Sequence, residues 1–411
     1  MTVLDVVALL VGVAGAVARP FRLPPWAIAA ACVAVVLAVG GATAHAAGTA
    51  LEPLRDPIAF LLAAVPLAVL LDRLGWFAAV AGLLARRGAG GGGLWVLAAL
   101  VTTVLNLDAS VVLLTPLYVS IAKGRAEPPM VLAVQPVLLA CLASSALPVS
   151  NLTNLIATSA TGASTGEFLA ALGLPSLAAT VVGWVAYRRW AAAQAPGSPA
   201  PVAGTPRPPA LADASPDAPA DRRAIVAGSL VVLGVLVGFT LGHDVGLQPW
   251  EVALAADLVL VALVRQLPWR VVPVSTALVA ATLGVLASAA SAHLPVARLI
   301  SGATTLDQLR ATGAAALAAN VANNLPALLV ALPALGAHTS PSLWSVLVGV
   351  NMGPVLLATG SLASLLWLDS LGRLGVPARP RDFTAVGVRV GLPALVAGAA
   401  VHLGLHAVGV G

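Results

Sequence analysis

Long apolar segments separated by short polar ones run along the whole chain. A transmembrane helix needs about 20 apolar residues, or fewer when protein partly surrounds it. Helices of this kind are expected near residues 3–18, 26–44, 57–72, 168–190, 224–241, 250–264, 271–290 and 384–405. Two shorter segments, near 76–85 and 294–300, are predicted to be amphipathic or interfacial helices.

Polar side chains interrupt one further apolar segment at a depth where lipid would surround a simple helix. This segment covers residues 130–160 and is broken by the run Pro148–Leu155. Polar groups at that depth are tolerated only where they face a cavity lined by protein. The polar side chains of this break are Ser150, Asn151, Thr153 and Asn154.

A second interrupted segment, residues 342–371, repeats the pattern of the first. Residues 360–366 read G-S-L-A-S-L-L and align with S-N-L-T-N-L-I at residues 150–156, a constant offset of 210 residues. The polar side chains of this second break are Ser361 and Ser364. The sequence therefore predicts a duplicated chain with one broken helix in each half.

Two other stretches have a polar tip with too few apolar residues on either side to cross a bilayer. Residues 94–121 and 305–336 are each apolar, then polar at the centre, then apolar again. This pattern is typical of re-entrant hairpins, whose tips lie within protein at membrane depth. The candidate functional residues at the two tips are Asn106, Asp108, Ser110, Asn320, Asn323 and Asn324.

The order of these segments divides the chain into two halves. Residues 1–190 and 224–411 each contain three helices, a hairpin, a broken helix and one more helix. Residues 191–223 are rich in Pro and Ala, and we expect them to form a cytoplasmic linker. The predicted fold class is an all-α polytopic membrane protein with about 10 transmembrane helices, two re-entrant hairpins and two broken helices.

Composition and charge place this chain in a membrane and orient it there. Of 411 residues, 59% are hydrophobic and 9% are charged, whereas a soluble domain carries about 25% charged residues. With the N-terminus outside, eighteen of the 21 Lys and Arg residues fall in cytoplasmic segments, and the exceptions are Arg55, Arg298 and Arg310. Both termini then lie outside the cell membrane, the linker is cytoplasmic, and the two halves are inverted repeats.

Inverted repeats with interrupted helices are typical of secondary transporters, which bind substrate where those helices meet. No Lys or Arg lies in the four polar motifs, so a small neutral hydroxylated solute, or a weakly charged one, is favoured over a di- or tricarboxylate. We expect about half of the tip amides to touch substrate and the others to cap half-helices. The hydroxyl groups of the two breaks have the alternative role of bonding the backbone of their own breaks.

Two acids are candidates for proton coupling. A carboxylate at membrane depth costs about 2.5–3.5 kcal/mol, so Asp108 is a functional candidate, and its alternative role is to cap a helix. Asp257 lies in the middle of an apolar helix, in A-A-D-L-V-L, and is either a second coupling acid or a solvated groove residue.

Other chemistries have little support in the sequence. There is no His-Glu-x-x-His motif, no cluster of aspartates and no nucleophile with a base at membrane depth, so an enzyme is not expected. The sequence has no phosphate-binding loop of the form G-x-x-x-x-G-K-[ST], so ATP hydrolysis is not expected. Cys32 and Cys141 are isolated, so we expect neither a disulfide framework nor a metal site, and no cofactor.

Four stretches of the chain carry a family resemblance: Asn106–Pro116, Leu147–Ile156, Asn320–Leu328 and Gly349–Leu368. They resemble the arsenite and antimonite permease family of the ArsB type, within the ion transporter superfamily. The resemblance covers both halves and leaves out the linker. It implies export of trivalent arsenic or antimony hydroxide in exchange for protons, in some members with a soluble ATPase partner.

Two positions depart from the pattern of that family. Where the family often has G-x-D-L-G-P-K, residues 349–355 read G-V-N-M-G-P-V, so an acid and a base are both missing. The first tip, often N-D-G-A, reads N-L-D-A here. If the missing acid carries coupling, either Asp108 or Asp257 must replace it, or the coupling differs. The alternatives to arsenite efflux are a sodium/proton antiporter and an inorganic or organic anion transporter on the same fold.

Overall fold

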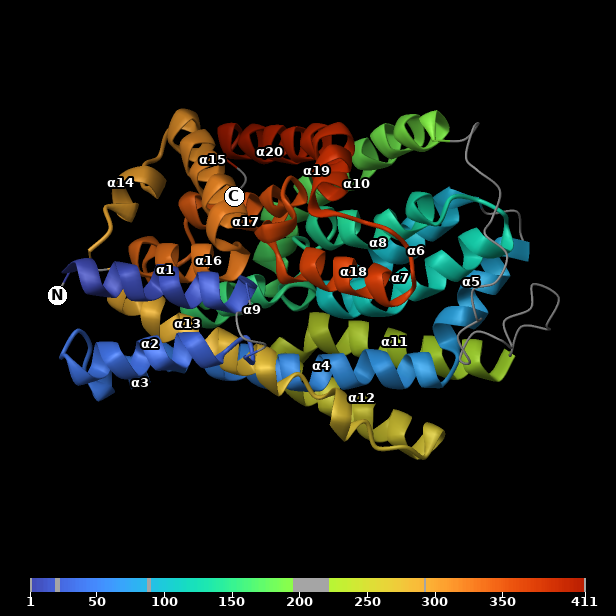
Figure 1. Cartoon of the computed structure of the whole chain (residues 1–411), viewed down its shortest axis with the longest axis horizontal. Coiled ribbons are helices and arrows are strands. Elements are labelled where there is room, and N and C mark those ends of the chain that lie inside the picture. The colour runs from blue at the N-terminus through green and yellow to red at the C-terminus, as the bar shows by residue number, and fades with distance from the viewer. Residues whose placement is uncertain (1, 19–22, 87–89, 195–221, 292, 410–411) are drawn as a thin grey trace.

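The computed structural model describes residues 2–18, 23–86, 90–194, 222–291 and 293–409, and all regular structure within them is helical (Figure 1). Six of the described helical segments are long and apolar enough to cross a membrane. The prediction of an all-α polytopic membrane protein is therefore confirmed. Most of the predicted linker lies outside the described residues, and the number of crossings stays a prediction.

The helices follow the predicted order in both halves. Those of the first half are α1 (Thr2–Ala18), α2 (Ala27–Ala38), α3 (Ala44–Leu51), α4 (Arg55–Arg73), α5 (Trp76–Arg86), α6 (Gly91–Val104), α7 (Leu107–Gly124), α8 (Pro129–Leu142), α9 (Leu152–Thr161) and α10 (Thr165–Ala193). Those of the second half are α11 (Arg222–Leu241), α12 (Pro249–Val264), α13 (Val274–Ser291), α14 (Val296–Ile300), α15 (Thr305–Ala322), α16 (Asn324–Leu335), α17 (Pro341–Met352), α18 (Leu362–Arg373), α19 (Pro380–Val386) and α20 (Leu392–Ala407).

One predicted helix was too long. The segment near 26–44 is not continuous, because α2 ends at Ala38 and α3 begins only at Ala44. Gly40 takes a left-handed backbone conformation, with φ of +74°, which ends α2. Thr43 then caps α3, its side-chain oxygen accepting a hydrogen bond from the backbone N–H of Ala46 at 3.1 Å.

The interruptions lie where the polar motifs predicted them. The first break separates α8 from α9, the second separates α17 from α18, and the hairpin tips separate α6 from α7 and α15 from α16. Asn106 and Asn323 stand at the two tips with positive φ values of 153° and 79° and ψ values of 153° and 152°, a backbone region that residues other than glycine rarely adopt. Figure 1 shows the α6–α7 pair and the α15–α16 pair towards opposite ends of the molecule.

Equivalent hydrogen bonds join each hairpin to the break of its own half. In the first half, the hydroxyl of Thr103 on α6 donates to the backbone oxygen of Ala143 at 3.0 Å. In the second, the amide of Asn320 on α15 donates to the backbone oxygen of Gly353 at 2.8 Å. Ala143 and Gly353 are separated by the same 210 residues as the repeated motif.

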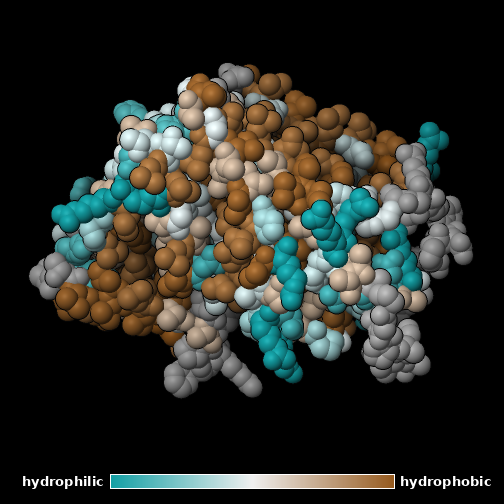
Figure 2. Space-filling model, turned by 90° about the horizontal axis from the view of Figure 1, so that it is seen from above, coloured by the Kyte–Doolittle hydropathy of each residue, from teal (hydrophilic) through white to brown (hydrophobic). Residues whose placement is uncertain are grey.

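The outer surface of the molecule suits lipid. Figure 2 shows apolar residues over a broad area, with polar side chains gathered in smaller patches. On α10, Leu177 and Val181 are exposed, and so is Val396 on α20. Exposed apolar side chains on long helices are what a bilayer requires, since lipid tails are as apolar as leucine.

Small residues allow the last helices of the two halves to pack closely. α10 packs against α20. A Cβ atom at Gly398 of α20 would lie 2.7 Å from the sulfur of Met352 and 3.1 Å from the backbone oxygen of Pro175. Small residues at such positions are the usual means of close helix approach in membranes.

We expect Gly398→Val to destabilise the protein by about 1–3 kcal/mol, because the added methyl groups overpack this contact. The matched control is Gly404→Val on the same helix, where an added Cβ would meet no atom within 4 Å. The measurement is the temperature at which half of the purified protein loses its monodisperse size-exclusion peak after heating in detergent. An equal fall of this temperature in both variants would contradict the close packing at Gly398.

Candidate functional site

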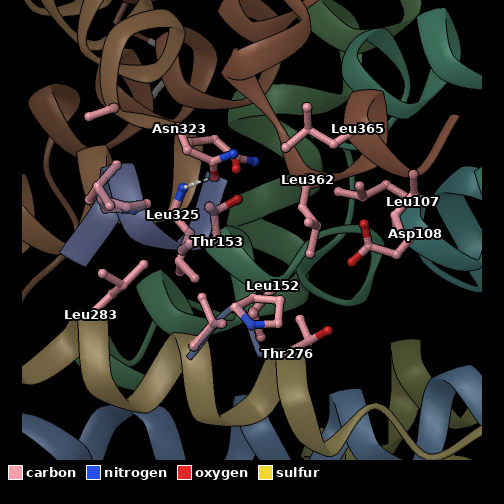
Figure 3. Close-up of a pocket in the computed structure, with 18 of the residues that line it drawn as sticks. Leu107, Asp108, Leu152, Thr153, Thr276, Leu283, Asn323, Leu325, Leu362 and Leu365 are labelled. Carbon is pink, nitrogen blue, oxygen red and sulfur yellow. Dashed lines mark hydrogen bonds between the residues drawn. The ribbon is translucent and has the colours of Figure 1, made fainter. Parts of the chain in front are cut away.

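A cavity of about 340 Å³ lies where the interrupted helices of the two halves meet (Figure 3). The starts of α7, α9, α16 and α18 line one part of it, and α1 and α13 line the rest. Leucine side chains make up much of the wall. In Figure 3, Asp108 lies towards one end, with Leu362 between it and the group of Asn323, Thr153 and Leu325.

Four helix N-termini surround this cavity. The lining includes Leu107, Leu152 and Leu362, the first residues of α7, α9 and α18, and also Asn324, the first residue of α16. Each N-terminus carries the equivalent of roughly half a positive charge from the aligned peptide dipoles. No Lys or Arg lines the cavity among the described residues. The site therefore attracts oxygen atoms without offering a full positive charge.

Polar residues at all four N-termini cap the helices that follow them. The side-chain oxygens of Asn106, Asn151 and Asn323 each accept a hydrogen bond from the backbone N–H two residues later, at 2.8, 3.2 and 3.3 Å respectively. Ser361 caps α18 through a 3.2 Å hydrogen bond from the backbone N–H of Ser364. These bonds fix the direction of each N-terminus.

Other predicted residues hold the breaks in shape. Asn154 donates to two backbone oxygens of its own break, each at 2.9 Å. Besides its bond to Gly353, Asn320 accepts a hydrogen bond from the backbone N–H of Leu357 at 3.0 Å. Ser150 donates to a backbone oxygen of α6 at 2.7 Å. These side chains replace the partners that an unbroken helix would provide.

Asn351, at the end of α17, joins the second half to the break of the first. Its side-chain oxygen accepts hydrogen bonds from Asn151 at 3.0 Å and from the hydroxyl of Thr153 at 2.7 Å. Its amide nitrogen donates to the side-chain oxygen of Asn154 at 2.6 Å. All four residues are buried. The position that was noted in the sequence only as a missing acid is thus the bridge between the two halves.

The two candidate acids occupy different surroundings. Asp108 lines the cavity, and its buried Oδ1 oxygen has no hydrogen-bond partner among the described residues. Asp257 is also buried, with one unpartnered oxygen in the described part of the chain, but it does not line the cavity. Its helix α12 packs against α4 and α11. Only Asp108 can therefore meet a solute in this cavity.

The cavity brings some of the predicted residues together and leaves others outside. Those that line it are Asp108, Asn151, Thr153, Asn323 and Asn324. Those that do not are Asn106, Ser110, Ser150, Asn154, Asn320, Ser361, Ser364 and Asp257. The sequence analysis missed Ser275 and Thr276, which line the cavity from α13. No motif marked them, because Ser and Thr are common in apolar helices.

Comparison with known proteins identifies relatives over most of the chain. Residues 3–363 match the sequence profile of a citrate transporter family. The chain is 25% identical over 365 residues to the arsenical pump membrane protein of Escherichia coli (strain K12), covering 82% of this chain and 83% of that protein. The protein of the same name from Shigella flexneri matches equally. The one from Yersinia enterocolitica is 25% identical over 189 residues, covering 41% of this chain and 44% of that protein.

Asn351→Ala is expected to destabilise the protein by about 2–4 kcal/mol, because it leaves three buried polar side chains without their shared partner. Ser342→Ala, at the start of the same helix, is the control. Thermal unfolding of the two purified variants in detergent measures the difference. Unfolding temperatures within a degree of each other would show that the bridge adds nothing to stability.

Proposed function

The chain belongs to the citrate transporter family. We propose that, within this family of transporters, it exports trivalent arsenic and antimony hydroxides in exchange for protons. The observation that carries this proposal is the cavity, which four helix N-termini surround and which no Lys or Arg of the described residues lines. The similarity to arsenical pump membrane proteins over 82% of the chain supports the same substrate class.

The lack of basic side chains among the described lining residues argues for a neutral solute. A tricarboxylate is bound most tightly by charge-assisted hydrogen bonds from Arg or Lys, and in the part of the chain that the structure describes neither lines the cavity. Arsenic and antimony trihydroxides are uncharged near neutral pH and carry three hydroxyl groups. Such a solute donates hydrogen bonds to side-chain oxygens and accepts them from amides or backbone N–H groups.

Asp108 provides a simple route to proton exchange. In its ionised form, the unpartnered Oδ1 oxygen accepts a hydrogen bond from a substrate hydroxyl. Once protonated, the same oxygen no longer holds the substrate in that way, so proton and substrate compete for one group. Asp257 is kept as a second candidate for coupling, acting at a distance from the cavity.

Alternating access follows from the arrangement of the helices. α7 packs against α18, and α9 packs against α16, so the hairpins and broken helices of both halves form one bundle together with α10 and α20. We propose that this bundle moves against the helices that open each half. The matched hydrogen bonds at Thr103 and Asn320 support the inference that the halves are inverted repeats.

The proposed topology places the protein in the cell membrane with both termini outside and residues 191–223 in the cytoplasm, as the distribution of Lys and Arg predicts. A soluble ATPase partner, which the resemblance implies for some members, stays a prediction.

One specific observation favours a second candidate. The matching family is described as one of citrate transporters, so an organic or inorganic anion carrier is the alternative substrate class. A sodium/proton antiporter is the other alternative, because amide and hydroxyl oxygens also bind Na⁺. The described lining of the cavity holds no basic residue, which favours the hydroxide over the anion.

Everted membrane vesicles with an acidic interior are expected to accumulate arsenite, and antimonite is expected to compete. The physical reason is that protons leaving the vesicle drive arsenite inward through the carrier. Vesicles lacking the protein are the control. Uptake driven by a sodium gradient alone, or uptake of citrate in place of arsenite, would refute the proposed function.

Asp108→Asn is expected to abolish accumulation driven by the pH gradient while leaving the amount of protein in the membrane unchanged. The amide keeps the shape of the side chain but cannot carry the proton. Asp369→Asn is the control, since Asp369 is exposed and pairs with Arg373 at 2.8 Å. Accumulation by the Asp108 variant at the wild-type level would show that another group couples transport, and Asp257→Asn would then be measured in the same assay.

A further inference from the structure

Three polar side chains around the cavity, those of Asn151, Thr153 and Asn323, already make hydrogen bonds within the protein. Asn151 and Thr153 bond Asn351, and the oxygens of Asn151 and Asn323 cap their helices. Two buried oxygens in the cavity have no hydrogen-bond partner among the described residues: Oδ1 of Asp108 and Oγ of Ser275. An unpaired buried polar atom costs free energy, so these two atoms are the ones that a bound solute would satisfy.

Asp108 and Ser275 come from different parts of the structure. Asp108 lies in the first turn of α7, in the bundle of hairpins and broken helices. Ser275 lies in the first turn of α13, which packs against α16 of the bundle and also against α1, α2 and α3. α13, α1 and α2 are among the helices that open the two halves. A movement of the bundle relative to those helices would therefore separate Asp108 from Ser275.

A second hollow lies further along two of the helices that line this cavity. It has a volume of about 650 Å³ and is lined by Gly284 and Ser288 of α13 and by Leu329 and Leu332 of α16. α13 and α16 thus bound both spaces, with Leu283 of α13 in the wall of the first. The first cavity lies nearer the start of α13, and the second lies further along the same helix.

The start of α13 marks the cytoplasmic side in the proposed topology. The connection before α13 carries Arg265 and Arg270, both exposed. Pro25, in the connection between α1 and α2, lines the same cavity. Ser275 therefore stands at the cytoplasmic end of the solute's path.

We propose that Ser275 is a substrate-binding residue that acts in one conformation only, holding a hydroxylated solute against Asp108 when the cavity faces the cytoplasm. This inference rests on the proposed function. A hydroxyl group of the solute donates to Asp108 Oδ1, and a second solute oxygen receives the hydrogen bond of the Ser275 hydroxyl. When the bundle moves, the solute travels with Asp108 and leaves Ser275 behind. Ser275 thereby contributes to capture from the cytoplasm and not to binding from outside.

The test is Ser275→Ala, assayed with arsenite in everted and in right-side-out vesicles that hold equal amounts of the protein. Everted vesicles present the cytoplasmic face to the added arsenite. Loss of one hydrogen bond is expected to raise KM there about three- to tenfold, while KM in right-side-out vesicles is unchanged. Thr276→Val, the neighbouring lining residue, provides a second variant of the same helix turn.

Thr282→Val is the matched control, because Thr282 lies on α13 outside the cavity and its hydroxyl bonds the backbone oxygen of Leu278 at 2.7 Å. It should leave KM unchanged at both faces. An equal rise from both faces for Ser275→Ala, or no rise from either, overturns the one-conformation role while wild-type transport keeps the proposed function intact. Wild-type protein that carries no arsenite overturns the proposed function and this inference together.

Discussion

Hydrogen bonding of the backbone inside the membrane is the constraint on which the rest of the structure depends. An interrupted helix leaves N–H and C=O groups without partners, and lipid provides none. In this protein, side-chain amides supply them: Asn154 holds the first break, and Asn320 holds the second. Because these amides and the capping residues fix the chain at each interruption, the four half-helices begin at one cavity. The broken helices thus produce a site that is surrounded by the positive ends of helix dipoles.

Asn351 connects the second half of the chain to the helix break of the first half. One amide satisfies three polar side chains of the opposite half, at 2.6 to 3.0 Å, in a buried position. A carboxylate at that place would accept from Asn151 and Thr153 but could not donate to Asn154. An amide at position 351 therefore suits a rigid contact between the breaks, and it leaves Asp108 as the acid of the cavity. This division of roles explains why the family pattern can lose an acid at one position while a carboxylate remains nearby.

The architecture was predictable because its signals are local and repeated. Polar residues inside apolar segments identified both breaks and both tips, and the offset of 210 residues is the signal for the proposed duplication. The roles of individual amides were not predictable in the same way. Asn106 and Asn323 were candidates for both capping and binding, and only the surrounding backbone shows that their oxygens are used as caps. Ser275 had no signal at all, since its importance arises from the missing partner of its hydroxyl and from the distant helix that faces it.

The central claim is that a cavity of helix N-termini, lined by no basic residue in the described parts of the chain, selects a neutral trihydroxide over a carboxylate. Isothermal titration of the purified protein in detergent at neutral pH, with arsenite, antimonite and citrate in turn, tests it most directly. The account predicts that arsenite and antimonite bind competitively at one site, and that citrate gives no heat of binding with or without a divalent cation. Citrate binding in the absence of any arsenite binding would contradict the claim and assign the cavity to carboxylates.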